Sequence, residues 1–151
     1  MTEPDVEALL RDRSLRVTVP RLAVLQAVQD HPHADTDTVI SAVRSAAGRV
    51  SHQAVYDVLR VLTDVGLVRR IQPPGATARY EARVGDNHHH LVCRSCGDIV
   101  VVDCAVGRVA CLSPDDDHGF VVDEAEVVYW GTCPGCASAA STSEPPPEGT
   151  R

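Results

Sequence analysis

The chain has no lysine, so all fourteen of its basic residues are arginines. Aromatic residues are also scarce, and one Phe, one Trp and three Tyr leave the core to Val, Leu, Ile and Ala. No apolar run approaches the roughly 20 residues of a membrane-spanning helix, so no membrane partner is expected. The N-terminus carries Glu3, Asp5 and Glu7 where an export signal would be basic and then apolar, which predicts a cytoplasmic protein.

Charge is distributed unevenly along the 151 residues. The net charge of −7 would by itself argue against a nucleic-acid partner. Residues 1–85 carry a net charge of +1, however, and residues 86–151 carry −8. The two halves are therefore expected to have different tasks.

Four of the six cysteines form two C-x-x-C pairs about 40 residues apart, Cys93 with Cys96 and Cys133 with Cys136. Each pair places two thiolates at the tip of a tight turn, and two such turns complete a tetrahedral zinc site without an open position. The spacing predicts structural Zn²⁺. Two disulfides are the alternative, and they would require an oxidising compartment.

The first half shows apolar residues at helical spacing, followed by a hairpin pattern. We expect helices over Val6–Arg13, from Pro20 to His31, from Asp35 or Thr36 to Gly48, and from Ser51 to Gly66. Strands over 67–72 and 76–82 would flank the turn Pro73-Pro74-Gly75. Three or four helices before a hairpin are typical of a winged helix-turn-helix, in which the fourth helix reads DNA.

The second half is rich in β-branched residues and predicts strands. The expected strands cover residues 91–93, 99–103, 120–122 and 127–131, with a short helix over 104–112. The Ser-, Ala- and Pro-rich sequence from Ala137 onward is expected to be disordered, because it cannot bury a core.

Several motifs together resemble the ferric uptake regulator (Fur) superfamily over about residues 8–136. They are the run 50–59, Gly66-Leu67-Val68, Arg79-Tyr80-Glu81, residues 88–93 and the two C-x-x-C pairs. Residues 86–90 and Cys104…Cys111 look like the actinobacterial FurA/CatR branch, which represses catalase genes in response to peroxide. The resemblance implies an α+β protein: a winged-helix DNA-binding domain over 1–83, an α/β dimerisation and metal-binding domain over 84–137 with the Cys₄ zinc site, and a disordered tail over 138–151.

The resemblance also implies a regulatory metal site made of His33, Glu81, His88 and His90. On a strand, His88 and His90 face the same side, which makes a chelating pair independently of the family. Imidazole and carboxylate suit Fe(II), Mn(II) or Zn(II), and the resemblance favours Fe(II). The alternatives are that the histidines form a polar strand, and that His33 only caps a helix.

A further acidic ligand is common in the family at the position of Val101. Asp103, two residues along the same strand, faces the same side and is a candidate replacement. Glu81 stands where the best-known peroxide sensors carry Asp and iron sensors commonly carry Glu. Cys104 and Cys111 leave a thiol-based response open, and small buried hydrophobes are their alternative role.

The expected DNA contacts gather at the start of the fourth helix and before the second. Their members are Ser51, Gln53, Tyr56 and Arg60, together with Arg16, which resembles the family's basic minor-groove residue. For each arginine, plain solvated surface is the alternative. Many relatives have Tyr-Arg where this chain has Tyr56-Asp57, which argues against an ordinary iron-box operator.

These features together predict a homodimeric, metal-dependent repressor that binds a double-stranded DNA operator and takes no small organic substrate. Within that class we favour peroxide control of catalase and oxidative-stress genes, with iron, zinc or nickel homeostasis as the alternative. An enzyme is not expected, because four cysteines close the zinc site and no Ser/His/Asp arrangement or phosphate loop is evident. A plain interaction module would not explain why arginine-bearing helices precede a hairpin.

Overall fold

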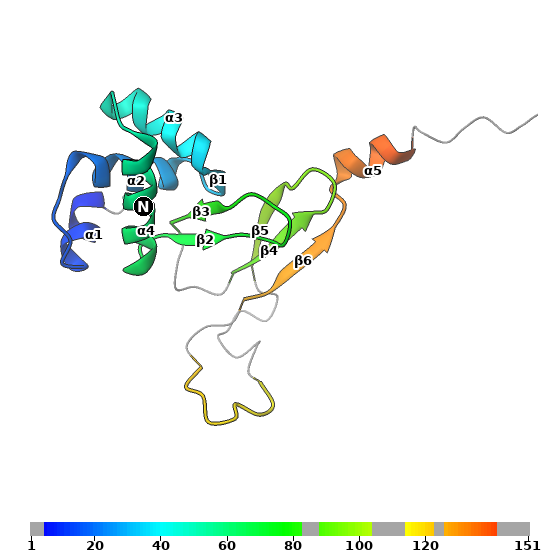
Figure 1. Ribbon diagram of the computed structural model, residues 1–151. Helices are drawn as coiled ribbons and strands as arrows, with labels where there is room; N and C mark the ends of the chain where they lie inside the picture. The colour runs from blue at the N-terminus through cyan, green and yellow to red at the C-terminus, as the bar shows by residue number, and fades with distance from the viewer. Residues whose placement is uncertain (1–4, 83–87, 104–113, 123–125, 142–151) are drawn as a thin grey trace, which may run out of the picture. The chain divides into compact units, whose positions relative to one another are not determined.

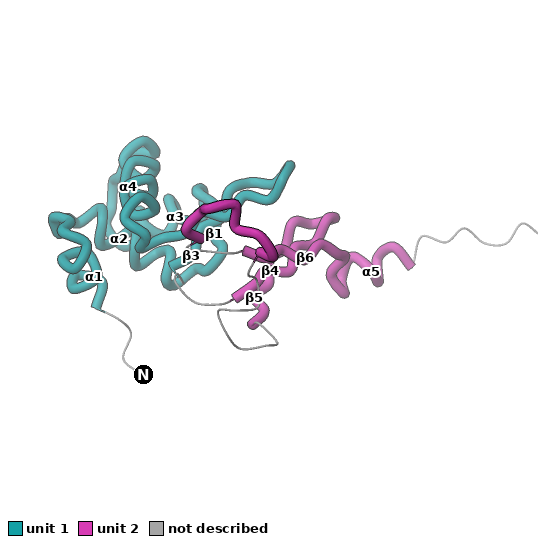
Figure 2. Tube along the Cα trace, turned by 90° about the horizontal axis from the view of Figure 1, so that it is seen from below, with its two compact units in different colours: residues 1–85 teal, residues 86–151 magenta. Residues whose placement is uncertain are grey.

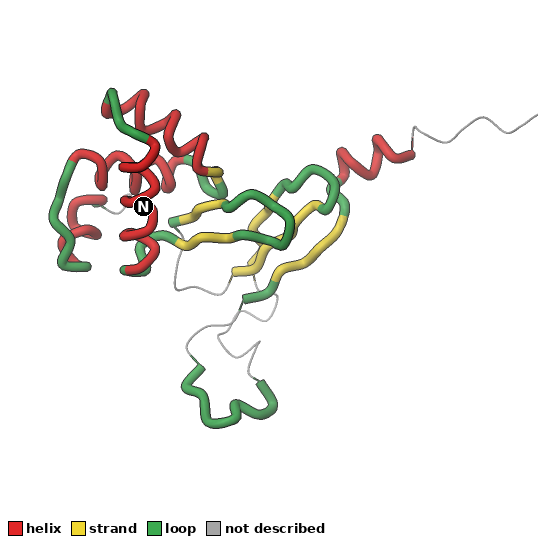
Figure 3. The backbone as a smooth tube through the Cα atoms, viewed as in Figure 1, coloured by secondary structure: helices red, strands yellow, loops and turns green. Residues whose placement is uncertain are grey.

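The computed structural model describes residues 5–82, 88–103, 114–122 and 126–141. The chain divides into two compact units, residues 1–85 and residues 86–151, which Figure 2 colours separately. The first unit consists mainly of helices and the second is organised around strands (Figure 3). This is the α+β composition that the sequence predicted.

Four helices make up most of the first unit (Figure 1): α1 Val6–Asp12, α2 Val19–Asp30, α3 Thr36–Ala47 and α4 His52–Asp64. Each of them begins after a residue whose side chain caps it, and the caps of α3 and α4 were predicted from the sequence. Oxygens of Asp5, Thr18, Asp35 and Ser51 accept hydrogen bonds from the backbone N–H groups of the first turns of α1, α2, α3 and α4.

The apolar stripes of these helices form the core of the first unit. Leu10, Val24, Leu25, Val28, Val39, Val43, Val55, Leu59 and Leu62 are at most 1% exposed. Helix α4 buries Val55, Leu59 and Leu62 and packs Val58 partly against this core, which leaves Gln53, Tyr56 and Arg60 exposed on its other face.

A small antiparallel sheet completes the first unit, in the order β1-β3-β2, with β1 Ala34–Asp35, β2 Arg69–Ile71 and β3 Arg79–Glu81. The hairpin strands are shorter than predicted. At the start of the first, the N–H groups of Leu67 and Val68 donate to the carbonyl of Leu62 at the end of α4 and so do not join the sheet. Strand β1 was not predicted. It pairs Ala34 with Tyr80 and Asp35 with Arg79, and so aligns the chain after α2 with β3.

The second unit contains a three-stranded sheet in the order β5-β4-β6. Strand β4 (His88–Cys93) is antiparallel to β5 (Ile99–Asp103) and parallel to β6 (Val128–Gly131), and helix α5 (Pro134–Ser141) follows. The predicted helix over 104–112 lies outside the described residues. Residues 120–122 were predicted as a strand but form none, and their side chains are 51–96% exposed.

The predicted disordered tail over 138–151 is wrong for its first four residues. Helix α5 continues to Ser141, since Pro134 opens a first turn and the following run of Ala and Ser tolerates a helix. Its first turn also carries Cys136, which ties it to the cysteine cluster. Within the part of the chain that is described, no helix has the length and apolar character to cross a membrane.

Candidate metal centres and nucleic-acid interface

The two C-x-x-C pairs meet in the second unit, as the sequence predicted. Sulfur atoms of Cys93, Cys96, Cys133 and Cys136 all lie within 4.8 Å of one another. The Sγ atoms of Cys96 and Cys133 are 3.8 Å apart, although 37 residues separate them. A tetrahedral zinc with Zn–S bonds of about 2.3 Å has sulfurs about 3.8 Å apart. The cluster therefore fits a structural Zn²⁺, and the free sulfurs exclude the alternative of two disulfides in this structure.

Backbone groups prepare the cluster for a cation. The N–H of Cys133 donates to Cys93 Sγ over 3.3 Å, and this bond is the largest cause that lowers the pKa of the Cys93 thiol to about 6. The other thiols, Cys133 first, raise the pKa of Cys136 to about 12. Four sulfurs this close cannot all ionise without a compensating positive charge, and a bound divalent cation supplies it.

Two of the four predicted regulatory ligands lie together in the first unit. Nε2 of His33 is 3.1 Å from Oε2 of Glu81, and the Glu81 side chain is only 2% exposed. His33 has a left-handed backbone, with φ of 62°, and its N–H donates to the carbonyl of Tyr80. Strand pairing thus holds the imidazole against the carboxylate, an arrangement suited to chelating a divalent metal. It goes beyond the helix-capping role considered for His33.

The other two predicted ligands, His88 and His90, are buried on one face of β4 in the second unit. Their rings are 5.0 Å apart between centroids, which agrees with the predicted alternation. Asp103 pairs directly with His88 across the β4–β5 ladder, and Val101 pairs with His90. Directly paired residues share a face of a sheet, so Asp103 lies on the side of the two histidines, as predicted.

A carboxylate that the sequence analysis did not single out lies beside His90. Oε1 of Glu126 is 4.0 Å from Nδ1 of His90, and the parallel pairing of β6 with β4 brings it there. A carboxylate close to one ring nitrogen can orient an imidazole whose other nitrogen binds a metal. The only signal in the sequence was an acidic residue just before a strand.

The predicted DNA-reading residues lie on the exposed face of α4 and at its start. Ser51 caps the helix, and Gln53, Tyr56 and Arg60 follow at a helical spacing that leaves all three exposed, with Tyr56 at 47%. The side chains of Gln53, Tyr56 and Arg60 thus point away from the core and are available to base edges and phosphates. Arg16 is exposed in the connection before α2, where its carbonyl accepts a hydrogen bond from Arg21 over 2.8 Å.

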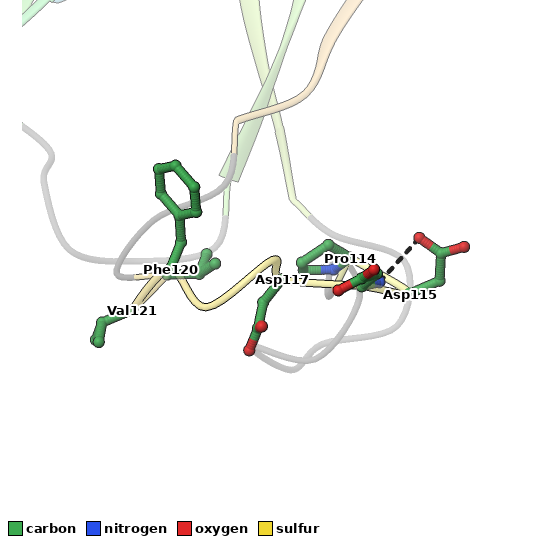
Figure 4. A pocket seen from close by; sticks show the side chains of 7 residues that line it. Pro114, Asp115, Asp117, Phe120 and Val121 are labelled. Atoms are coloured by element: carbon green, nitrogen blue, oxygen red, sulfur yellow. Dashed lines mark hydrogen bonds between the residues drawn. The ribbon is translucent and has the colours of Figure 1, made fainter.

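The acidic loop 114–122 of the second unit lines an open pocket (Figure 4). Its carboxylates serve the loop itself: Asp116 accepts from the N–H of His118, and Asp117 from the N–H of Gly119. These bonds stabilise turns. Among the described residues the loop contributes to no cluster that could hold a metal.

Comparison with known proteins agrees with this arrangement. The sequence model that describes the ferric uptake regulator family matches residues 12–127 of this chain. The chain belongs to the ferric uptake regulator family. It is 63% identical over 143 residues to the transcriptional regulator FurA of Mycobacterium tuberculosis. The aligned region covers 94% of this chain and 97% of that protein.

Solved structures of the family have the same fold. The ferric uptake regulator of Pseudomonas aeruginosa with manganese aligns with a TM-score of 0.67 and 26% identity, over 85% of this chain and 98% of that one. The Campylobacter jejuni peroxide stress regulator aligns with a TM-score of 0.64 and 25% identity, over 85% and 96%. The predicted α+β fold is thereby confirmed.

Membership of the family decides the class of function. This chain is a metal-responsive transcriptional regulator and not an enzyme, as predicted. The cysteine cluster and the pair of His33 and Glu81 are accordingly candidate metal sites of this regulator.

Proposed function

We propose that this protein is a homodimeric, metal-dependent repressor of catalase and oxidative-stress genes that releases its operator when peroxide is present. The observation that carries the proposal is the pair of donor sets without thiolate: His33 with Glu81 on the first unit, and His88 with His90 on the second. Such donors bind Fe(II) or Mn(II) without the strong preference for zinc that thiolates give. Because the protein is proposed to bind an operator, its proposed location is the cytoplasm.

The proposed ligands of the regulatory ion are His33, Glu81, His88 and His90. Because a ligand stabilises the conformation that it binds best, metal occupancy is proposed to be converted into DNA affinity. Asp103 is the proposed acidic ligand, because Val101 occupies the position where the family commonly has one. Glu126 is proposed to orient His90. The cysteine cluster is proposed to hold a separate, structural Zn²⁺ that supports the second unit.

Fe(II) is the proposed native ion, because bound Fe(II) supplies the one-electron chemistry that makes such a site sensitive to peroxide. Mn(II) in the same site would give DNA binding without that sensitivity. The likeness to the Campylobacter jejuni peroxide stress regulator supports this finer assignment.

The DNA contact is proposed to be made by α4 in the major groove, with Ser51, Gln53 and Tyr56 at base edges and Arg60 at a phosphate. Arg16 is proposed to contact the backbone or the minor groove. The single reading helix per chain makes a two-fold dimer and a palindromic operator the natural arrangement.

An exposed row of apolar side chains supports a dimer through the second unit. Val100, Leu91 and Tyr129 are neighbours across β5, β4 and β6 and are 51, 44 and 49% exposed. A continuous apolar row on one face of a sheet favours a protein partner, and the proposed occupant is a second copy of this chain.

The deciding experiment uses anaerobically purified protein and DNA from the region upstream of its own gene. The protein is loaded with Fe(II), Mn(II) or Zn(II) in turn, operator binding is measured, and micromolar peroxide is then added. Release of DNA by the Fe(II) form alone supports the proposal. Release by every form, reversed by a thiol reductant, would instead assign the response to cysteines.

A response to metal without a response to peroxide would favour the alternative, an iron-homeostasis repressor. Glu81, which stands where iron sensors of the family commonly carry Glu, is the observation on the side of that alternative. The assigned ligands are tested with the double variant His88→Ala and His90→Ala. It should remain folded and should no longer bind the operator in response to metal. Unchanged metal dependence in this variant would refute the assigned ligands.

A further inference from the structure

The exposed face of α4 carries a carboxylate in the middle of its proposed DNA-reading residues. Gln53, Asp57 and Arg60 are spaced four and three residues apart and share this face with Tyr56. Asp57 is 53% exposed and Arg60 is 74% exposed, so neither is held by the core. A negative charge at this place opposes the phosphates of any DNA that α4 approaches.

Asp57 contacts the side chains on both sides of it. Its Oδ1 accepts a hydrogen bond from Nε2 of Gln53 over 3.0 Å, and the same oxygen is 3.9 Å from Nη2 of Arg60. The bond to Gln53 joins neighbouring turns of one helix and favours the orientation in which the amide nitrogen faces Asp57. The carbonyl oxygen of Gln53 and its second N–H are then left for a base.

We propose that Asp57 is the specificity-determining residue of the reading helix: it positions the Gln53 amide and weakens binding to DNA that offers only phosphates. A preset amide recognises adenine, whose N6 amino group donates and whose N7 accepts, without first choosing an orientation. The carboxylate itself can accept a hydrogen bond from the amino group of cytosine. On other sequences it meets no donor, and its charge disfavours the complex. The inference depends on the proposed function, because it assumes that α4 enters the major groove.

The contact with Arg60 adds a second effect. While the guanidinium stays beside Asp57, its charge is partly balanced and is less available to a phosphate. Removal of the carboxylate should release Arg60 to the DNA backbone. Each additional phosphate contact steepens the fall of log affinity with log salt by about one unit.

The test compares Asp57→Ala, Asp57→Asn and the control Asp64→Asn in the Mn(II)-loaded protein. Asp64 is an exposed carboxylate at the end of the same helix, seven residues from Asp57. Affinity is measured at several salt concentrations for the duplex that wild-type protein selects from a random library and for a scrambled duplex of the same composition. Circular dichroism checks that each variant is folded.

We expect Asp57→Ala to lower the ratio of selected to scrambled affinity about tenfold, mainly by tighter binding to the scrambled duplex. Its salt slope on that duplex should steepen by about one unit. Asp57→Asn removes the charge but keeps an oxygen for Gln53, so it should lose less of the ratio than Asp57→Ala. A ratio within twofold of the Asp64→Asn control would overturn the proposal.

A double-mutant cycle with Gln53→Ala tests the positioning role directly. If Asp57 acts through Gln53, the effects of Gln53→Ala and Asp57→Ala on the selected duplex will not add. Strict additivity would refute the positioning role. A wild-type protein that shows no preference for any duplex would instead refute the proposed function, which keeps the two failures distinguishable.

Discussion

The sulfurs of Cys96 and Cys133 lie 3.8 Å apart, the edge of a zinc-centred tetrahedron, although one follows β4 and the other follows β6. The cluster thus joins the end of the sheet to the start of α5. Because a zinc ion would connect these elements, its binding free energy contributes to the folding of the second unit.

The first prediction is that Cys96→Ser removes the zinc and the folded dimer together. Three thiolates cannot complete the tetrahedron, and structural zinc is commonly lost only with unfolding. Zinc content per chain, circular dichroism and sedimentation measure the three properties in one preparation. The control is Ser95→Ala, an exposed neighbour that is not part of the cluster. A stable dimer of Cys96→Ser without zinc would contradict the assignment.

The second prediction concerns the pair of His33 and Glu81. Either His33→Ala or Glu81→Gln should weaken binding of Mn(II) at least about tenfold while the structural zinc remains, because each removes one ligand or its charge. Calorimetric titration of the zinc-loaded protein with Mn(II) measures the change. His118→Ala is the control, since that imidazole is 77% exposed on the acidic loop. Equal Mn(II) affinity in His33→Ala and His118→Ala would show that His33 is not a ligand.

The third prediction is that Leu91→Arg shifts the protein from dimer to monomer. Leu91 lies in the centre of the exposed row between Val100 and Tyr129, and a buried guanidinium without a partner would oppose association. Sedimentation at several protein concentrations should give a dimer dissociation constant raised at least about tenfold. Val121→Arg is the control, because Val121 is 96% exposed outside the row. An unchanged dimer in Leu91→Arg would exclude this face as the interface.

Features fixed by neighbouring residues were predicted well from the sequence. The capping residues Asp35 and Ser51 mark helix starts because a cap and its helix are contiguous in the chain. The alternation of His88 and His90 followed from the geometry of one strand. The cysteine cluster was predictable although its halves are distant, because each C-x-x-C pair is itself a local motif.

Features that depend on which segments become partners were missed. The position of Glu126 beside His90 requires the parallel pairing of β6 with β4, and nothing near Glu126 in the sequence encodes that partner. Strand β1 is two residues long, too short to show a period, yet it aligns His33 with β3. Residues 120–122 have β propensity without a strand, because propensity is expressed only where a neighbouring strand is available.

The fourth prediction follows from Asp35, which caps α3 and pairs with Arg79 across β1 and β3. Hydrogen bonds from Thr38, from its side chain first and then from its backbone N–H, lower the pKa of Asp35 below its ordinary value of 3.8. The charged form therefore stabilises the fold above pH 3.8, and this contribution is lost as the pH falls through the lowered pKa. Asp35→Ala should lower the free energy of unfolding by about 1 kcal/mol at neutral pH and by less in acid. Urea unfolding at neutral and acidic pH measures the difference. The control is Asp64→Ala, which should lose no stability, because Asp64 lies at the C-terminal end of α4, where a negative charge is unfavourable. A loss in Asp35→Ala that does not change with pH would show that the charge of the cap makes no contribution.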